Sequence, residues 1–228
     1  MRRSSSMLAA AAAIASLALT IGVSPASAGS SLTANPPSPG LQTSEFTTAE
    51  SRFYGHAFNQ GWWANNDATS NSNDNYIVGR CCGRINHRNF FTFDLSSLDR
   101  RVVFAQLRVH SAVVRGDAIE RIGLFDVSIP AATVNFNTTI DLDIFADLGT
   151  GSSYGVFDIA RDQDREILQL TLNRSAINDI NDASGGFFSI GGRLLSLGDR
   201  REEFLFGRSG KFPAELVVRT VPGDRSND

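Results

Sequence analysis

The stretch RNFFTFDLSSLDRRVVFAQLRV, residues 88–109, decides the fold of this chain. In its first half Phe91, Phe93 and Leu95 alternate with polar residues and share one face of a strand. The same alternation in the second half joins Val103, Ala105, Leu107 and Val109. The Asp and Ser residues between the two halves are typical of a turn. The segment therefore predicts two adjacent, paired strands of a sandwich with a Phe-rich core.

Short runs of the same kind continue along the chain, each bounded by Gly, Asp, Asn or Pro. Besides 89–95 and 102–113 they are Tyr76–Gly79, Arg121–Val127, Tyr154–Ile159, Ile167–Leu172, Phe187–Ile190, Phe204–Phe206 and Leu216–Thr220. Many short strands separated by turns predict an all-β fold, an antiparallel two-sheet β-sandwich of jelly-roll-like form.

One or two short helices interrupt this pattern. Asn173 is a good N-cap, Ile177 and Ile180 share a face, and the pair Gly185-Gly186 ends the helical run. We expect this helix to cover one end of the sandwich. A second helical turn is expected within 141–148.

The first 28 residues have the pattern of a signal peptide. Arg2 and Arg3 precede an apolar run, and Ala26-Ser27-Ala28 provides the small residues that a signal peptidase requires. We therefore expect a signal peptide at 1–28, a flexible leader at 29–44, one sandwich domain at 45–221 and a polar tail at 222–228. The expected location is extracellular, with no membrane span after cleavage.

The charges of the chain are nearly balanced and well interspersed, with 21 basic and 24 acidic side chains. A surface of this kind has no basic stripe that would follow a phosphate backbone. Nucleic acid is therefore a poor candidate partner.

Several of the strand motifs resemble known extracellular families. FFTFDLSSL followed by VVFAQLRV, and the later PAELVV at 213–218, resemble strands of DNRLRE-type sandwich modules. NYIVG at 75, IFADLGTG at 144, GGFFSIGG at 185 and EFLFG at 203 are similar to the globular domain of bacterial PEP-CTERM surface-sorted proteins. The resemblance implies a sandwich fold, export and, by analogy with related modules, carbohydrate binding. The final residues, PGDRSND, lack the apolar helix and basic stop of that sorting anchor.

The two cysteines, Cys81 and Cys82, are neighbours in the segment GRCCGR, which is typical of a hairpin tip. Adjacent Cα atoms lie about 3.8 Å apart, below the usual disulfide range of about 4.4–6.8 Å. An ordinary disulfide framework is therefore excluded. A vicinal disulfide, an intermolecular bridge and two free thiols remain as alternatives.

The best candidate for a ligand site is the segment that contains both tryptophans. A sugar site combines an aromatic platform with amide or carboxylate groups that bind hydroxyls. The candidate glycan-binding residues are Tyr54, His56, Trp62, Trp63, Asn65, Asn66 and Asp67. If this segment is a strand, one Trp faces the core and the other the surface, which is the alternative interpretation.

Calcium is the one metal that the sequence suggests, because the loop after Trp63 is rich in side-chain oxygens. The candidate ligands are Asp67, Asn71, Asn73 and Asp74. The loop lacks the Gly and the terminal Glu of the helix-loop-helix calcium motif, and no other cofactor is expected.

Motifs of known catalytic sites are absent from the sequence. No G-x-S-x-G, H-E-x-x-H or phosphate-binding Gly loop occurs. His110 shares the polar face of a predicted strand with Gln106 and Arg108, which favours a surface histidine over a catalytic base. We therefore expect a secreted, non-enzymatic binding or surface-associated module whose partner is a polysaccharide or a cell-surface or matrix component. The alternative is an extracellular structural protein without a small-ligand site.

Overall fold

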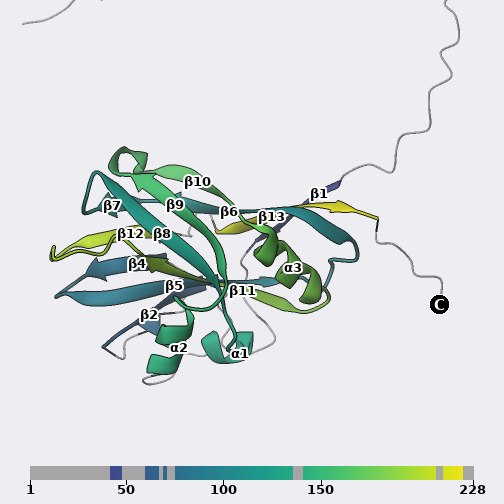
Figure 1. Ribbon diagram of the computed structural model, residues 1–228, viewed down its shortest axis with the longest axis horizontal. Coiled ribbons are helices and arrows are strands. Elements are labelled where there is room, and N and C mark those ends of the chain that lie inside the picture. The colour runs from purple at the N-terminus through teal and green to yellow at the C-terminus, as the bar shows by residue number, and fades with distance from the viewer. Residues whose placement is uncertain are drawn as a thin grey trace, which may run out of the picture. The chain divides into compact units, whose positions relative to one another are not determined.

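The computed structural model describes residues 42–47, 60–66, 69–70, 75–135, 141–208 and 213–222. These residues form two antiparallel sheets that face each other, with short helices at the margins (Figure 1). The predicted fold class, an all-β antiparallel two-sheet sandwich, is confirmed. Each of the nine predicted strands overlaps an observed one, although the predicted strand 102–113 runs past the end of the strand Arg101–Ser111 into the separate strand Val113–Arg115.

The smaller sheet has four strands in the order β1-β13-β6-β10. Their bounds are β1 Gln42–Thr47, β13 Glu215–Val221, β6 Arg101–Ser111 and β10 Glu166–Thr171. Strand β1 begins three residues before the expected start of the domain, because its backbone pairs with β13 from Gln42 onward.

The larger sheet has nine strands, and its main path is β7-β12-β4-β5-β11-β8-β9. The bounds are β7 Val113–Arg115, β12 Glu203–Arg208, β4 Asn75–Cys81, β5 Ile85–Asp94, β11 Phe187–Leu194, β8 Ile119–Asp126 and β9 Ser153–Ala160. Strand β2, Gln60–Ala64, pairs with β5 outside this path and carries the short β3, Thr69–Ser70.

The main core fills the space between the two sheets. Phe91, Phe93 and Leu95 of the deciding stretch are at most 1% exposed there, as their alternation predicts. They pack with apolar residues of both sheets, including Tyr76, Leu107, Leu168, Ile190 and Val218. Burial of these large apolar side chains is the main stabilising contribution to the fold.

The expectation that the two strands of the deciding stretch pair with each other is wrong. Strand β5 pairs with β2, β4 and β11 in the larger sheet, whereas β6 pairs with β13 and β10 in the smaller one. The connection between them carries the buried Leu95 and Leu98, so it crosses from sheet to sheet instead of making a hairpin. The alternation of apolar residues is the same in both arrangements, because it reports which face is buried and not which strand is adjacent.

Val103 was expected on the buried face of β6, but it is 37% exposed. The register between β6 and β13 shifts at this point, since Arg219 pairs with Phe104 and Thr220 pairs with Val102. The β-bulge puts Val102 into the core in place of Val103, while Ala105, Leu107 and Val109 are buried as expected.

The predicted helix is α3, Arg174–Asp182, and it covers one end of the sandwich (Figure 1). The side chain of Asn173 accepts hydrogen bonds from the backbone N–H groups of Ser175 and Ala176, so it is the N-cap. The amide of Asn181 both accepts from Val102 N and donates to Val102 O, which attaches the helix to β6.

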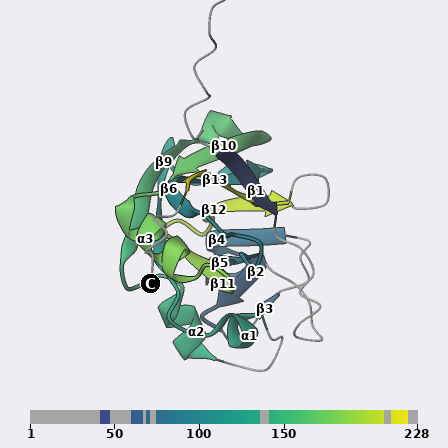
Figure 2. The ribbon, with the colours of Figure 1, turned by 90° about the vertical axis from the view of Figure 1, so that its right-hand side faces the viewer.

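Two further short helices lie on the outer face of the larger sheet (Figure 2). They are α1 Ala131–Val134 and the expected α2 Leu142–Asp147, and a 3-10 turn, η1, follows β9 at Arg161–Gln163. Helices α1 and α2 cover a second small core made of Trp63, Phe90, Val134, Ile144 and Leu148. Both faces of β5 are therefore buried over part of its length.

Candidate functional site

Strand β2 places the two tryptophans on opposite faces of the larger sheet. Trp63 is 1% exposed, packs in the second core and donates its indole N–H to Val134 O at 3.2 Å. A ligand does not reach a side chain buried in this way. This burial removes Trp63 from the predicted glycan platform and agrees with the alternative interpretation of a core and a surface Trp.

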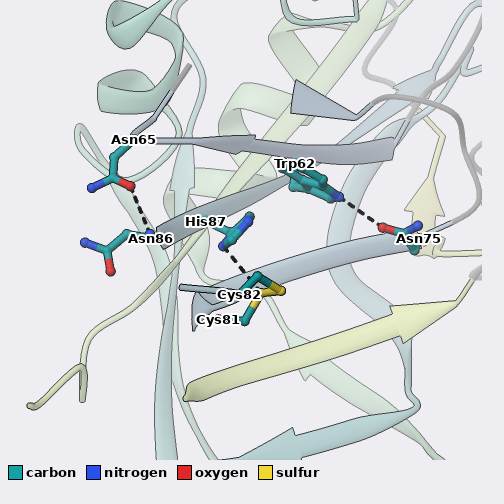
Figure 3. Close-up of a disulfide and its surroundings, with 7 residues drawn as sticks. All are labelled: Trp62, Asn65, Asn75, Cys81, Cys82, Asn86 and His87. Atoms are coloured by element: carbon teal, nitrogen blue, oxygen red, sulfur yellow. Dashed lines mark hydrogen bonds between the residues drawn. A yellow bond between two sulfur atoms is a disulfide. The ribbon is translucent and has the colours of Figure 1, made fainter. Parts of the chain in front are cut away.

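Trp62 is the half-buried member of the pair. Its indole N–H donates to Asn75 Oδ1 at 3.0 Å, and its ring meets the ring of His87 edge-on at 4.8 Å between centroids (Figure 3). The polar edge of the indole therefore has a partner within the protein. Only part of the ring surface remains for contact with another molecule.

Asn65 and Asn66 form the turn that follows β2, and both are exposed. Asn65 exchanges hydrogen bonds with the backbone of Asn86, donating from N to O at 3.0 Å and accepting at Oδ1 from N at 2.9 Å. The Asn65 side chain thus extends the pairing of β2 with β5.

The other predicted site residues lie outside the described residues. These are Tyr54, His56 and Asp67 of the glycan site, and all four candidate calcium ligands, Asp67, Asn71, Asn73 and Asp74. Within the described ranges, no group of three or more His, Cys, Asp or Glu side chains could hold a metal ion. The calcium site stays a prediction.

The neighbouring cysteines form a vicinal disulfide between Cys81 and Cys82 at the tip of the β4–β5 hairpin (Figure 3). Of the three alternatives that the sequence left open, this is the one observed. Cys81 is buried and Cys82 is exposed, and the turn residues Cys82, Gly83 and Arg84 all have positive φ angles.

His87 lies between the Trp62 ring and the disulfide (Figure 3). Its Nδ1 is 4.0 Å from Cys81 Sγ, and the residue is 7% exposed. Burial lowers the pKa of His87 below its ordinary value of 6.5, and hydrogen bonds to the backbone of Ile85 and Gly79 act in the opposite direction. The imidazole is therefore neutral at neutral pH, as a side chain packed between a ring and a sulfur requires.

A fork in the larger sheet opens beside these residues. Strand β4 pairs with residues 85–87 of β5, and β11 pairs with residues 89–94. Strand β2 pairs with residues 87–91 and so faces both of them across β5. Strands β4 and β11 therefore pair with two successive stretches of the same edge of β5. The gap between the two strands falls at Arg88.

Gly79 makes this fork sterically feasible. Its φ is +110°, and a Cβ at this position would lie 2.2 Å from Glu203 O and 2.9 Å from Leu194 Cδ2. The backbones of β4 and β12 and the side chain from β11 therefore meet closely at a residue that only glycine fills without strain.

A pocket of about 210 Å³ lies at this fork. Its lining combines cationic, amide, aromatic and aliphatic groups, namely Gly79, Asn86, His87, Arg88, Phe145, Arg193, Leu194, Leu195 and Leu197. The volume is below the roughly 300–1,000 Å³ of pockets for drug-sized ligands. It suits one small unit, such as a single sugar residue.

Arg88 is held firmly in the wall of the pocket. Its Nη1 donates to Phe145 O at 2.6 Å and to Ala146 O at 2.8 Å, and its guanidinium lies 4.3 Å from the centre of the Phe145 ring. The carbonyl groups belong to the last turn of α2, where a cation is favoured. Burial, and secondarily the charge of Arg193, lowers the pKa of Arg88 to about 10.

Arg193 is the second cation of the pocket and is exposed. Gly149 lies between the two arginines, because a Cβ on it would be 2.7 Å from Arg88 Nε and 3.0 Å from Arg193 Cβ. Neither arginine forms an ion pair with a carboxylate of the described residues. Two positive charges thus line the pocket, and no acid of the described ranges neutralises them.

A second hollow of about 330 Å³ lies over the smaller sheet, lined by Arg108, Val109, His110, Ile167, Gln169, Pro213 and Glu215. Here the cation has a partner, because Arg108 Nη1 lies 3.6 Å from Glu215 Oε2. His110 is partly exposed on the polar face of β6, as expected. The fork pocket is the stronger candidate, because its charges lack such partners.

Two buried glutamates, Glu120 and Glu203, lie at the margin of the larger sheet, and no sequence pattern predicts their burial. Glu120 accepts from Asp117 N and Ser196 Oγ, and Glu203 accepts from Gly198 N at 2.6 Å. Both carboxylates are therefore bound to loop residues, which fixes the turns beside β7 and β12.

Comparisons with protein-family models and with curated proteins found no match to this chain. The resemblance to DNRLRE-type and PEP-CTERM domains accordingly stays a prediction. No helix of the described residues has the length and apolar character needed to cross a membrane.

Proposed function

We propose that this protein is a secreted, non-enzymatic binding module whose ligand is a glycan, and that the fork pocket is its principal binding site. The observation that carries the proposal is the composition of the pocket. Phe145 and the leucines offer apolar contact for the face of a sugar ring, while Asn86 and the arginines offer donors for its oxygen atoms.

The surroundings of the pocket support this choice of ligand class. Asn86 Oδ1 already accepts from Arg80 Nε at 3.0 Å, which orients the amide and leaves its N–H groups for a ligand hydroxyl. Half-buried Trp62 does not line the pocket, but its ring meets the His87 ring edge-on and so helps to hold His87 in the pocket wall (Figure 3). Trp62, Asn65 and Asn66, the described surface residues of the predicted platform, do not line this pocket.

Two independent features support the proposal that the protein is secreted. Residues 1–28 have the charged start, apolar run and small-residue end of a signal peptide. The vicinal disulfide between Cys81 and Cys82 is a bond that persists in oxidising compartments and is rare in the cytosol.

A glycan array and titration calorimetry on the purified protein test the proposal. A Leu195→Trp variant fills the pocket from a residue that is 38% exposed, so the fold tolerates it. The matched control is Val103→Trp on the smaller sheet, where the exposed fraction is 37%.

We expect binding to fall at least about tenfold in Leu195→Trp and to stay unchanged in Val103→Trp. Equal binding by both variants would place the ligand elsewhere. Absence of any glycan binding by the wild-type protein would support the alternative of a structural extracellular protein.

A further inference from the structure

The two arginines of the fork pocket favour a ligand with one negative charge, because the pocket has room for a single small unit such as one sugar residue. Arg88 and Arg193 are close enough for the charge of Arg193 to disfavour the charged form of Arg88. Among the described residues no carboxylate pairs with either side chain. Like charges held together in a half-buried site repel each other, and a bound anion would relieve this repulsion.

The geometry of Arg88 favours recognition of a planar anion. Both N–H groups of its Nη1 are directed to the carbonyl groups of Phe145 and Ala146. Of the five N–H donors of a guanidinium, those on Nε and Nη2 remain without a partner among the described residues. Such a pair of parallel donors matches the two oxygens of a carboxylate.

The other residues that line the pocket favour a ligand with apolar and hydroxyl groups in addition to its charge. Phe145 and Leu195 supply an apolar wall beside the arginines, and Asn86 supplies an amide. A free inorganic anion would use none of these groups. A sugar ring that carries a carboxylate would use all of them.

The distribution of charge argues for a local anion rather than a polyanion stripe. The chain is acidic overall, with a formal net charge of −3. The pocket is thus a small positive site on an acidic protein, which fits one carboxylate at a time better than a row of phosphates.

We propose that the fork pocket binds a uronic acid residue of an acidic polysaccharide, with Arg88 and Arg193 as the cations that bind its carboxylate. This rests on the proposed glycan-binding function and specifies its ligand class. Arg88 is prepositioned by α2, and Arg193 closes on the carboxylate from the exposed side. Phe145 contacts the sugar ring.

The test compares the binding of a short galacturonic acid oligomer, its methyl ester and a neutral glucose oligomer of equal length to the purified protein by calorimetry. We expect the acid to bind at least about tenfold more tightly than the ester, because charge-assisted hydrogen bonds are lost on esterification. We also expect affinity for the acid to fall as salt concentration rises.

Arg193→Gln is the decisive variant, because an exposed side chain can be changed without loss of the fold. It should weaken binding of the acid at least about tenfold and leave binding of the ester unchanged. The control is Arg219→Gln on the smaller sheet, since Arg219 lies over Phe104 at 4.1 Å much as Arg88 lies over Phe145. Arg219→Gln removes the same charge and should leave binding of the acid unchanged.

Arg88→Gln provides a second measurement, with folding checked by thermal unfolding because this variant also loses the contacts to α2. Equal binding of acid, ester and neutral oligomer would overturn the uronic acid assignment while leaving glycan binding intact. Binding of inorganic phosphate as tight as that of the acid oligomer would also overturn it. No binding of any oligomer would refute the proposed function itself.

Discussion

Trp62 and Trp63 are adjacent in the chain, yet their indole N–H groups donate to partners on opposite sides of the larger sheet. The indole of Trp62 binds Asn75 Oδ1 on β4 at 3.0 Å, and that of Trp63 binds Val134 O on α1 at 3.2 Å. Strand alternation separates the two rings. One Trp is thereby a component of the core beneath α1 and α2, while the other lies on the opposite face of the sheet against His87.

Substitution of the two tryptophans should therefore have unequal effects. Trp63→Ala should reduce the free energy of unfolding by about 3 to 5 kcal/mol, since a large buried side chain leaves a cavity. Trp62→Ala should cost about 1 to 2 kcal/mol, because the ring is only half-buried. Urea denaturation of both variants measures the difference. Equal losses would show that the two rings are not separated as described.

Stability should depend on the protonation of His87. Burial lowers its pKa in the folded chain, whereas the unfolded chain takes up a proton near the ordinary value of 6.5. As pH falls below that value the unfolded state binds the extra proton, so the folded state loses stability until the lowered pKa is reached. Above about pH 7 this contribution is absent.

Denaturant titrations across the range from about pH 7.5 to 5 measure this effect. A His87→Gln variant should show a smaller decline than the wild type. An unchanged decline in His87→Gln would exclude His87 as its source.

Loss of the vicinal disulfide should affect stability only slightly. Disulfides typically stabilise by about 2 to 4 kcal/mol because they close long loops in the unfolded chain. Cys81 and Cys82 have a sequence separation of 1, so no long loop is closed. The Cys81→Ala/Cys82→Ala variant should therefore lose less than about 2 kcal/mol, most of it from the buried Cys81. A loss of about 4 kcal/mol or more in thermal unfolding would contradict this account.

Gly79→Ala should be strongly destabilising, because it combines a positive φ angle with a close backbone contact. Gly185→Ala is the matched control, with φ of +82° and nothing within 4 Å of the added Cβ. The control should cost about 1 kcal/mol from its backbone conformation alone. Gly79→Ala should cost at least about 2 kcal/mol more, since β4 and β12 must move apart. Similar losses in the two variants would mean that the fork is not tightly packed.

Local sequence patterns predicted the strands and helices of this fold, but they did not predict which strands pair with each other. The alternation around Phe91 and Phe93 predicts the strand and its buried face, and Asn173 predicts the start of α3. The assignment of β5 and β6 to different sheets depends on contacts with β11 and β13, which are distant in the sequence. The bulge that exposes Val103 arises likewise from its register with β13.

The candidate site was predicted less well than the fold. The sequence pattern predicted aromatic site residues and did not predict Arg88. An isolated arginine at the start of a predicted strand is typical of any surface residue. A usable signal lies in Phe90, which occupies the face of β5 opposite Phe91. An apolar residue on that face indicates a covered outer surface, and Arg88, two residues before Phe90, lies on the same face at the edge of the cover. Arg193 becomes its neighbour only through the pairing of β11 with β5.

The pairing of β1 with β13 joins the first described strand to the last. Gln42 lies opposite Thr220, and β1 pairs with no strand of the smaller sheet except β13. The ribosome therefore releases β1 long before the strand that receives it exists. During that interval the backbone groups of β1 lack the partner that they have in the folded sheet, so the smaller sheet is completed only once β13 has been made.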